Sequence, residues 1–252
     1  AFNGSFHYKF AVYGNMNMDR GNVSEVGGDG EFWDYDTYCN GITIFSNGTL
    51  IQNSTIWHGK LNGVQIRGNA APVIVDSVFF ENGINGILLT DNSSGDLVRN
   101  ILKHNGGDGI TNMRTSHANI IGCTIADNAY SGISAFHDAY PTISKCQSMN
   151  NWYCGVVIGG FTGQDTAHPT INNCTFEHDG DISPRPVIWG WDCTKTSISD
   201  CTFNSCYWAL SGWQWIGNNF AQFNVTRCKV NGDINDNCYG LDFANSNTGN
   251  VT

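Results

Sequence analysis

Three stretches of the chain decide its fold: SVFFENGINGILL (residues 77–89), NILKHNGGDGITN (100–112) and CTIADNAYSGISA (123–135). Each stretch begins 23 residues after the previous one and carries an apolar residue, an Asn and a Gly-Ile pair at the same offsets. Apolar positions alternate over three to five residues and are broken by Asn and Gly, which indicates short strands joined by tight turns. A helical solenoid needs a 3.6-residue period, which is absent here. The stretches therefore predict a repeating β unit.

The period extends in both directions and aligns residues of one kind in columns. The columns are a Gly column (Gly63, Gly86, Gly109, Gly132, Gly155), an Asn column (Asn82, Asn105, Asn128, Asn151), an apolar column (Ile56, Phe79, Leu102, Ile125, Ser148, then Phe176, Phe203, Val230) and a small-residue column (Ser54, Ser77, Asn100, Cys123, Cys146, Cys174, Cys201, Cys228). After Ser148 the spacing lengthens to 28, 27 and 27 residues. Coils stacked about 4.8 Å apart form parallel sheets in which equivalent residues make inward ladders. We therefore expect the four Asn amides to point inward and to stack.

On this pattern the chain resembles the right-handed parallel β-helix superfamily, the pectate-lyase-like fold of polysaccharide lyases, glycosidases, phage tailspikes and surface adhesins. The resemblance covers about Ile42 to Phe243 and implies an all-β solenoid of about eight coils. It says little about activity, because one fold hosts many functions. The chain lacks the Asn-Thr-Asp, Asp-Asp and Gly-His-Gly motifs of polygalacturonases and the Asp-Pro-His-Glu motif of alginate epimerases. No catalytic residue can therefore be carried over from these families.

The N-terminal part does not follow the repeat and is rich in aromatic residues. Open ends of a solenoid expose strand edges, which proteins cover or pair. We therefore expect residues 1–41 to form a cap or docking segment and residues 42–252 to form the β-helix. The C-terminal tail is polar and short, so the last coil is expected to bind the N-terminal segment of another copy, head to tail.

Composition narrows the classes of function. Only 13% of the 252 residues are charged and the formal net charge is −10, which disfavours nucleic acid and anionic membranes as partners. No apolar run reaches the roughly 18 residues that a membrane span needs.

Ten cysteines without a Cys-x-x-Cys pair and eight Asn-x-Ser/Thr sequons favour an extracellular or cell-surface location. The predicted glycosylation sites are Asn3, Asn22, Asn47, Asn53, Asn92, Asn173, Asn224 and Asn250. The disulfide candidates are Cys123, Cys146, Cys154, Cys174, Cys193, Cys201, Cys206, Cys228 and Cys238, and at least three disulfides are expected. Column neighbours such as Cys123 and Cys146 meet the Cα spacing for a bridge, although buried free thiols fit the same positions.

One column combines residue types that carry chemistry. Asp91, Arg114 and His137 are spaced by 23 residues, and Asp138 follows the last of them. A lyase needs a base, a group that neutralises the substrate carboxylate and often Ca²⁺, so this stripe is the most enzyme-like cluster. A solvated row of turn residues with an incidental salt bridge explains the same pattern.

Two further patterns contain residue types that bind metals, an acidic segment and a histidine column. Acidic residues near the N-terminus, Glu25, Asp29, Glu31, Asp34 and Asp36, form a weak Ca²⁺ candidate. His58, His104 and His178 share a column, but Glu81, Asp127, Asn150 and Ser205 interrupt it, which argues against a metal. No cofactor is predicted, apart from this option of Ca²⁺.

The long-coil half carries many tryptophans: Trp152, Trp189, Trp191, Trp208, Trp213 and Trp215. Such side chains stack on sugar rings, form interfaces or fill widened loops. Together the patterns favour a non-enzymatic extracellular structural glycoprotein, such as a surface, fibre or adhesin subunit. The alternatives are a polysaccharide lyase or glycoside hydrolase acting on an acidic polysaccharide, and a non-catalytic carbohydrate-binding module.

Overall fold

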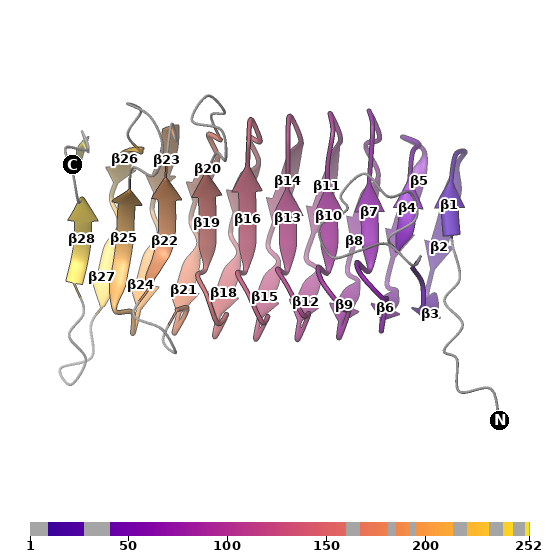
Figure 1. The fold of residues 1–252 in the computed structure, drawn as a ribbon, viewed down its shortest axis with the longest axis horizontal. Helices are drawn as coiled ribbons and strands as arrows, with labels where there is room; N and C mark the ends of the chain where they lie inside the picture. The colour runs from indigo at the N-terminus through magenta and orange to yellow at the C-terminus, as the bar shows by residue number, and fades with distance from the viewer. Residues whose placement is uncertain are drawn as a thin grey trace.

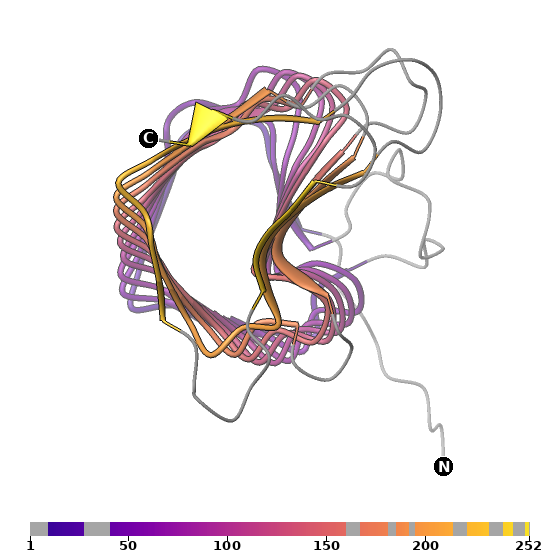
Figure 2. The same ribbon diagram turned by 90° about the vertical axis from the view of Figure 1, so that its left-hand side faces the viewer.

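The computed structural model describes residues 10–27, 41–159, 167–180, 185–191, 195–213, 221–231, 239–243 and 250–251, and every regular element in these ranges is a β-strand. The strands form three parallel sheets that the chain visits in turn, so that it winds as one solenoid with its coils stacked along a single axis (Figures 1 and 2). The all-β parallel solenoid predicted from the 23-residue period is confirmed. Within these ranges no helix has the length and apolarity to cross a membrane.

The first sheet contains β1 (Phe10–Val12), β4 (Ile42–Ile44), β7 (Val64–Ile66), β10 (Ile87–Leu89), β13 (Ile110–Asn112), β16 (Ile133–Phe136), β19 (Val156–Gly159), β22 (Pro186–Trp191), β25 (Trp208–Trp213) and β28 (Tyr239–Phe243). The second contains β2 (Met16–Asp19), β5 (Thr49–Gln52), β8 (Val73–Val75), β11 (Ser94–Val98), β14 (His117–Ile121), β17 (Thr142–Ser144), β20 (Thr170–Asn172), β23 (Lys195–Ser199), β26 (Gln222–Thr226) and β29 (Asn250–Val251). The third contains β3 (Asn22–Ser24), β6 (Thr55–Trp57), β9 (Val78–Phe80), β12 (Ile101–Lys103), β15 (Thr124–Ala126), β18 (Gln147–Met149), β21 (Thr175–Glu177), β24 (Thr202–Asn204) and β27 (Lys229–Asn231). The expected count of about eight coils roughly matches.

Columns of apolar side chains fill the interior. The column of the first sheet aligns Ile42, Val64, Ile87, Ile110, Ile133, Val156, Ile188 and Leu210. The column of the third sheet is the one predicted from sequence, and the rings of Phe176 and Phe203 stack in it with centroids 5.2 Å apart. Burial of one such side chain stabilises the fold by about 1.5–3 kcal/mol, so the columns supply the main favourable term.

The Gly column marks a close approach between neighbouring coils just before the first sheet. A Cβ atom at Gly86 would lie 2.7 Å from the carbonyl oxygen of Gly109 on the next coil. No side chain fits at that distance, which explains why Gly recurs there.

The predicted Asn ladder is confirmed. Asn82 donates from Nδ2 to Oδ1 of Asn105 at 2.9 Å, and the same bond repeats from Asn105 to Asn128 and from Asn128 to Asn151. Asn151 donates in turn to Oδ1 of Asp179 at 2.8 Å, so an acceptor-only carboxylate ends the ladder. All five side chains are buried. The ladder therefore ties five coils together through the turn between the third and first sheets.

The boundary expected after residue 41 does not hold, because Phe10–Ser24 already form strands of the solenoid. Strands β1, β2 and β3 pair in parallel with β4, β5 and β6. The period hid this coil because 32 residues separate Phe10 from its partner Ile42, instead of 23. Residues 1–9 and 28–40 of the predicted cap lie outside the described residues, as do residues 232–238 of the last coil that was expected to receive it.

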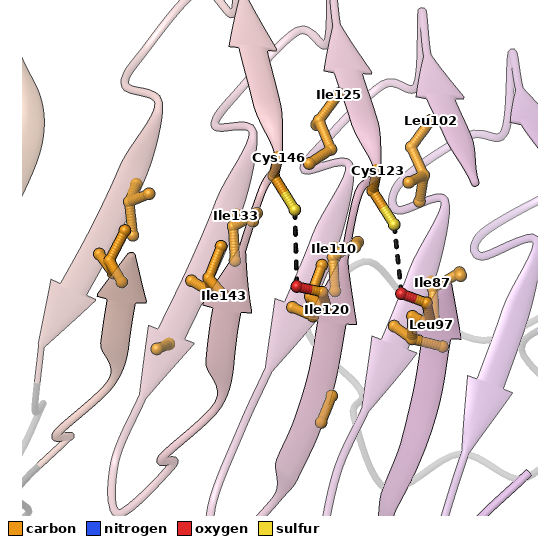
Figure 3. Packing of buried hydrophobic residues seen from close by; sticks show 14 of the residues in the cluster. Ile87, Leu97, Leu102, Ile110, Ile120, Cys123, Ile125, Ile133, Ile143 and Cys146 are labelled. Atoms are coloured by element: carbon orange, nitrogen blue, oxygen red, sulfur yellow. Dashed lines mark hydrogen bonds between the residues drawn. The ribbon is translucent and has the colours of Figure 1, made fainter. Parts of the chain in front are cut away.

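The cysteines differ from the expectation of at least three disulfides, because seven of them are free thiols: Cys123, Cys146, Cys154, Cys174, Cys201, Cys206 and Cys228. Cys123 donates from Sγ to the Leu97 carbonyl at 3.3 Å, and Cys146 to that of Ile120 at 3.5 Å (Figure 3). Asn100 makes the same bond one coil earlier, to Ile74. Side chains of the small-residue column thus donate hydrogen bonds to backbone carbonyls of the previous coil. A free thiol can fill this role, so the position does not require a disulfide. Cys193 and Cys238 lie outside the described residues.

Charged and polar residues with a left-handed backbone occupy the corners of the coils. The predicted glycosylation sites Asn53 and Asn173 share the corner between the second and third sheets, with φ of 48° and 51°, and both are exposed. Asn22, Asn47, Asn92 and Asn224 are exposed too, whereas Asn3 and the side chain of Asn250 lie outside the described part. Glycosylation itself stays a prediction.

Replacing Asn105 with Leu should lower the free energy of unfolding by roughly 2–4 kcal/mol, because the amide of Asn82 and the carbonyl of Phe79 lose their buried partner. The matched control is Asn92→Leu on the exposed surface, which should change stability by no more than about 0.5 kcal/mol. Urea unfolding followed by circular dichroism measures both. Equal losses in the two variants would contradict the role of the ladder.

Candidate functional site on the outer face of the first sheet

A second apolar cluster lies on the outer face of the first sheet, separate from the interior. Val156 and Ile158 of β19 point into the main core, so Val157 between them points outward. There it packs with Cys154 and Trp189. Figure 2 shows that the ribbon bends inward along this sheet, between two rows of turns.

Aromatic rings surround this cluster and contact one another across coils. The Tyr130 and Tyr153 rings stack at 4.4 Å, and the Tyr153 and Trp189 centroids lie 5.5 Å apart. Trp189 meets Trp191 edge to face at 5.1 Å, and Trp191 lies 5.9 Å from Phe136. The result is a continuous aromatic strip over three coils.

Gly159 creates the space for this strip. A Cβ atom there would lie 2.3 Å from Cε2 of Trp191, so the indole occupies the place that a side chain on β19 would take. Any larger residue at this position would displace the ring.

Arg185 adds a positive charge to the aromatic strip. Its Cζ atom lies 4.0 Å from the Tyr153 ring centroid and 5.3 Å from that of Trp189. Its Nη1 donates to the Tyr153 hydroxyl at 2.9 Å. Burial raises the pKa of Tyr153, and the charge of Arg185 opposes this only in part. Tyr153 is therefore a protonated phenol at neutral pH, able to donate a proton.

Asp108 is a buried carboxyl group in the second amide ladder, which has the opposite hydrogen-bond direction. Asn85 donates from Nδ2 back to Oδ1 of Asn62 at 3.0 Å, and Asp108 stands at the next place. Its side chain accepts from Thr111 Oγ1 at 2.7 Å and from the Ser131 amide at 3.0 Å. Burial raises the pKa of Asp108 despite these hydrogen bonds. An Asn at this place would continue the ladder without burying an ionisable group.

Asp108 and Arg185 belong to one electrostatic environment. The pKa of Tyr130 is raised mainly by burial, and the charge of Asp108 raises it further while Arg185 lowers it. Burial also raises the pKa of the Cys154 thiol. The charge of Arg185 lowers that pKa and the charge of Asp108 raises it. We refer to Tyr130, Tyr153, Arg185, Trp189 and Asp108 as the tyrosine–arginine cluster.

The predicted stripe lies at the other end of the same strands. Asp91, Arg114 and His137 follow β10, β13 and β16 at corners with left-handed backbone, with φ of 62°, 58° and 57°. Asp91 accepts hydrogen bonds from Arg114 and from Nε of the buried Arg67, the latter at 3.2 Å.

In this stripe the carboxylate of Asp91 is paired with arginine side chains. Burial raises the pKa of Asp91, but the hydrogen bond from Arg114 and the charge and hydrogen bond of Arg67 outweigh it and lower that pKa. Asp91 is therefore ionised and held by two guanidinium groups. Asp91, Arg114 and His137 do share one corner position on successive coils. Nothing in the sequence indicated that Arg67 also binds Asp91.

The other predicted sites separate into described and undescribed ones. Asp29, Glu31, Asp34 and Asp36 lie outside the described residues. Glu25 and Glu81 both pair with His58, with the Glu81 Oε2 atom 2.7 Å from Nε2 of the imidazole. In the described part of the chain, no group of three or more His, Cys, Asp or Glu side chains is arranged to hold a metal.

The described tryptophans differ in burial, and the roles expected for them stay predictions. Trp189 is buried and Trp191 partly buried, whereas Trp152 is 43% exposed. The side chain of Trp213 and residue Trp215 lie outside the described part. A sequence signal existed for Asp108, because it replaces Asn in the column of Asn62 and Asn85. None existed for Arg185, which follows an insertion that breaks the period.

Together, the fold and this outer face define a parallel β-helix protein with a charged and aromatic site on one sheet. The chain belongs to the right-handed β-helix family: the family described as "Right handed beta helix region" matches residues 2–121 and 93–252. No curated protein matches the chain in sequence.

Solved structures share the fold at low identity. The A-module of Azotobacter vinelandii mannuronan C-5 epimerase AlgE4 aligns with a TM-score of 0.56 and 13% identity, over 96% of this chain and 83% of that one. The A-module of AlgE6 from the same organism aligns with a TM-score of 0.54 and 12% identity, over 95% and 82%. Pectate lyase Pel9A aligns with a TM-score of 0.47 and 11% identity, over 93% and 79%. These identities show a common fold alone.

Replacing Asp108 with Asn should stabilise the protein at neutral pH. Because the native pKa of Asp108 is raised, its contribution to stability is complete below the ordinary carboxyl value of 3.8 and is lost as the pH rises through the native pKa. The variant should therefore exceed the native chain in urea midpoint at about pH 7 and differ less at about pH 3. The exposed Asp96→Asn change on β11 is the control. A variant with the same pH profile as the native chain would refute the assignment.

Proposed function

We propose that this chain is an enzyme that acts on an acidic polysaccharide, removing the proton from the carbon next to a uronate carboxylate. The polymer binds along the outer face of the first sheet. The main support for this proposal is the position of Arg185, which stacks on the Tyr153 ring and donates a hydrogen bond to its hydroxyl. This proposal takes the lyase alternative in place of the structural-glycoprotein hypothesis.

Arg185 suits the role of neutralising a sugar carboxylate. A guanidinium group binds carboxylates through two parallel hydrogen bonds, and a proton next to a neutralised carboxylate is easier to remove. Nη1 donates to the Tyr153 hydroxyl, and Nε is buried without a hydrogen-bond partner among the described residues. Because Arg185 as a whole is only partly buried, its guanidinium is a cationic group that a sugar carboxylate can approach beside the aromatic surface.

The tyrosines supply proton transfer. Tyr130 is 41% exposed and stacks on Tyr153, whose phenol is protonated because burial raises its pKa. The proton that leaves the sugar carbon is taken by Tyr130 in its phenolate form, and the protonated phenol of Tyr153 donates a proton to the leaving glycosidic oxygen or, in an epimerisation, to the opposite face of the sugar carbon. The indole of Trp191 is only partly buried and offers an apolar surface against which a pyranose ring can pack.

The position of the carboxyl groups favours elimination or epimerisation over hydrolysis. Glycosidases generally need two carboxyl groups facing the scissile bond. Near the tyrosine–arginine cluster the described carboxyl groups are Asp108 and Asp179, which are only 6% and 0% exposed and which both belong to amide ladders. The groups that reach the surface are phenols and a guanidinium. The name of two aligned structures, mannuronan C-5 epimerase, agrees with this choice of substrate class.

The test is deuterium incorporation into mannuronan and polygalacturonate in D₂O. Nuclear magnetic resonance should show deuterium at the carbon next to the carboxylate, or ultraviolet absorbance should show an unsaturated product. New reducing ends without either signal would indicate a hydrolase, and no change in any polyuronate would contradict the proposal.

Arg185→Gln should lower the rate of this exchange roughly 100-fold, since it removes the charge that stabilises the carbanion-like transition state. Arg185→Lys keeps the charge and should recover part of the rate, which separates loss of function from loss of folding. The matched control is Arg99→Gln at the corner between the second and third sheets, where Arg99 pairs with Asp76. It should stay within about twofold of the native rate.

The extracellular or cell-surface location and the head-to-tail assembly stay predictions. The location rests on the cysteine content and the sequons. The assembly rests on the two ends of the chain, which lie mostly outside the described residues.

A further inference from the structure

Outward aromatic residues on this solenoid generally stack on a partner one coil away. Trp57 stacks on Phe80 at 5.5 Å with an interplanar angle of 10°, and Tyr140 stacks on His117 at 4.8 Å with an angle of 3°. The stacking follows from the fold, because equivalent residues on parallel strands lie about 4.8 Å apart.

Trp152 departs from this arrangement. Backbone hydrogen bonds place it in one column with Ala129 on the previous coil and Gly180 on the next. Neither neighbour has a ring or a long side chain, and the ring of Tyr153 meets Trp152 only at 6.5 Å and a 35° tilt. Trp152 is 43% exposed and lines a surface depression, so part of its indole is accessible to a ligand.

Polar groups stand beside this open face. A shallow depression is lined by Asp127, Asn128, Ala129, Asn150 and Trp152. Asn128 is committed to the buried ladder, so the available polar side chains are those of Asp127 and Asn150. Both are exposed at corner positions with φ of 54°, on successive coils.

We propose that this depression binds one uncharged pyranose unit of a polysaccharide. The C–H face of the sugar stacks on the indole of Trp152, the carboxylate of Asp127 accepts hydrogen bonds from sugar hydroxyls, and the Asn150 amide both donates and accepts. An exposed carboxylate in the depression repels a uronate, so the sugar here is neutral.

The inference goes beyond the proposed reaction, since it concerns another surface and another class of sugar. The depression lies at the corner before the first sheet, whereas the uronate is assigned to the outer face of that sheet. A chain that carries both sites would bind a polymer, or two polymers, containing charged and neutral units.

The experiment is a binding titration by isothermal calorimetry with mannohexaose, cellohexaose and maltohexaose as neutral probes, and a mannuronate hexamer as the charged one. At least one neutral probe should bind the native chain. Trp152→Ala should weaken that binding at least tenfold, Trp152→Phe should recover part of it, and the exposed Tyr140→Ala should leave it unchanged.

Arg185→Gln separates this proposal from the proposed function, because it should leave neutral-sugar binding intact while it weakens binding of the mannuronate hexamer. The inference is overturned if no neutral probe binds, if Trp152→Ala binds as well as the native chain, or if Trp152→Ala weakens only the mannuronate hexamer. Circular dichroism of each variant excludes unfolding as the cause.

Discussion

The structure depends on hydrogen bonds between buried amides of successive coils. In the main ladder each Asn donates toward the C-terminal end, and Asp179 closes the series as a pure acceptor. In the second ladder Asn85 donates toward the N-terminal end. The two ladders lie in the same turn and have opposite directions, so a slip of one coil against the next would break both. The turn before the first sheet is thereby held at one spacing, which sets where its outward side chains stand.

The corners of the coils carry charged side chains, in contrast to the buried neutral amides of the ladders. The charged columns of Asp91 and His58 occupy left-handed corner positions. A left-handed backbone costs about 1 kcal/mol for most residues, and Asn, Asp and Gly tolerate it best. The corners accept Arg, His and Glu as well, because pairs such as Arg99 with Asp76 bridge neighbouring coils. A charged column in such a fold is therefore weak evidence for a catalytic site, and a buried charge is stronger evidence.

Asp108 meets that stronger criterion. A carboxyl group in an amide ladder loses a donor and is buried, which raises its pKa and disfavours folding at neutral pH. Its charge acts on Tyr130 in the tyrosine–arginine cluster, which also contains a guanidinium, a second phenol and an indole. Natural proteins often sacrifice stability at functional sites. The coincidence of both features on one face is the physical basis for placing the function there.

The sequence by itself determined the architecture, because a parallel solenoid repeats the same contacts on every coil and so writes them into the chain at a fixed period. The Gly column, the apolar column and the ladder from Asn82 to Asn151 were all readable in this way. Only the tertiary structure decided that Phe10–Ser24 form a coil and that Arg185 lies against Tyr153. An insertion after Ser24 and others before Arg185 break the period, and once the period is lost, sequence distance no longer reports which side chains share a coil.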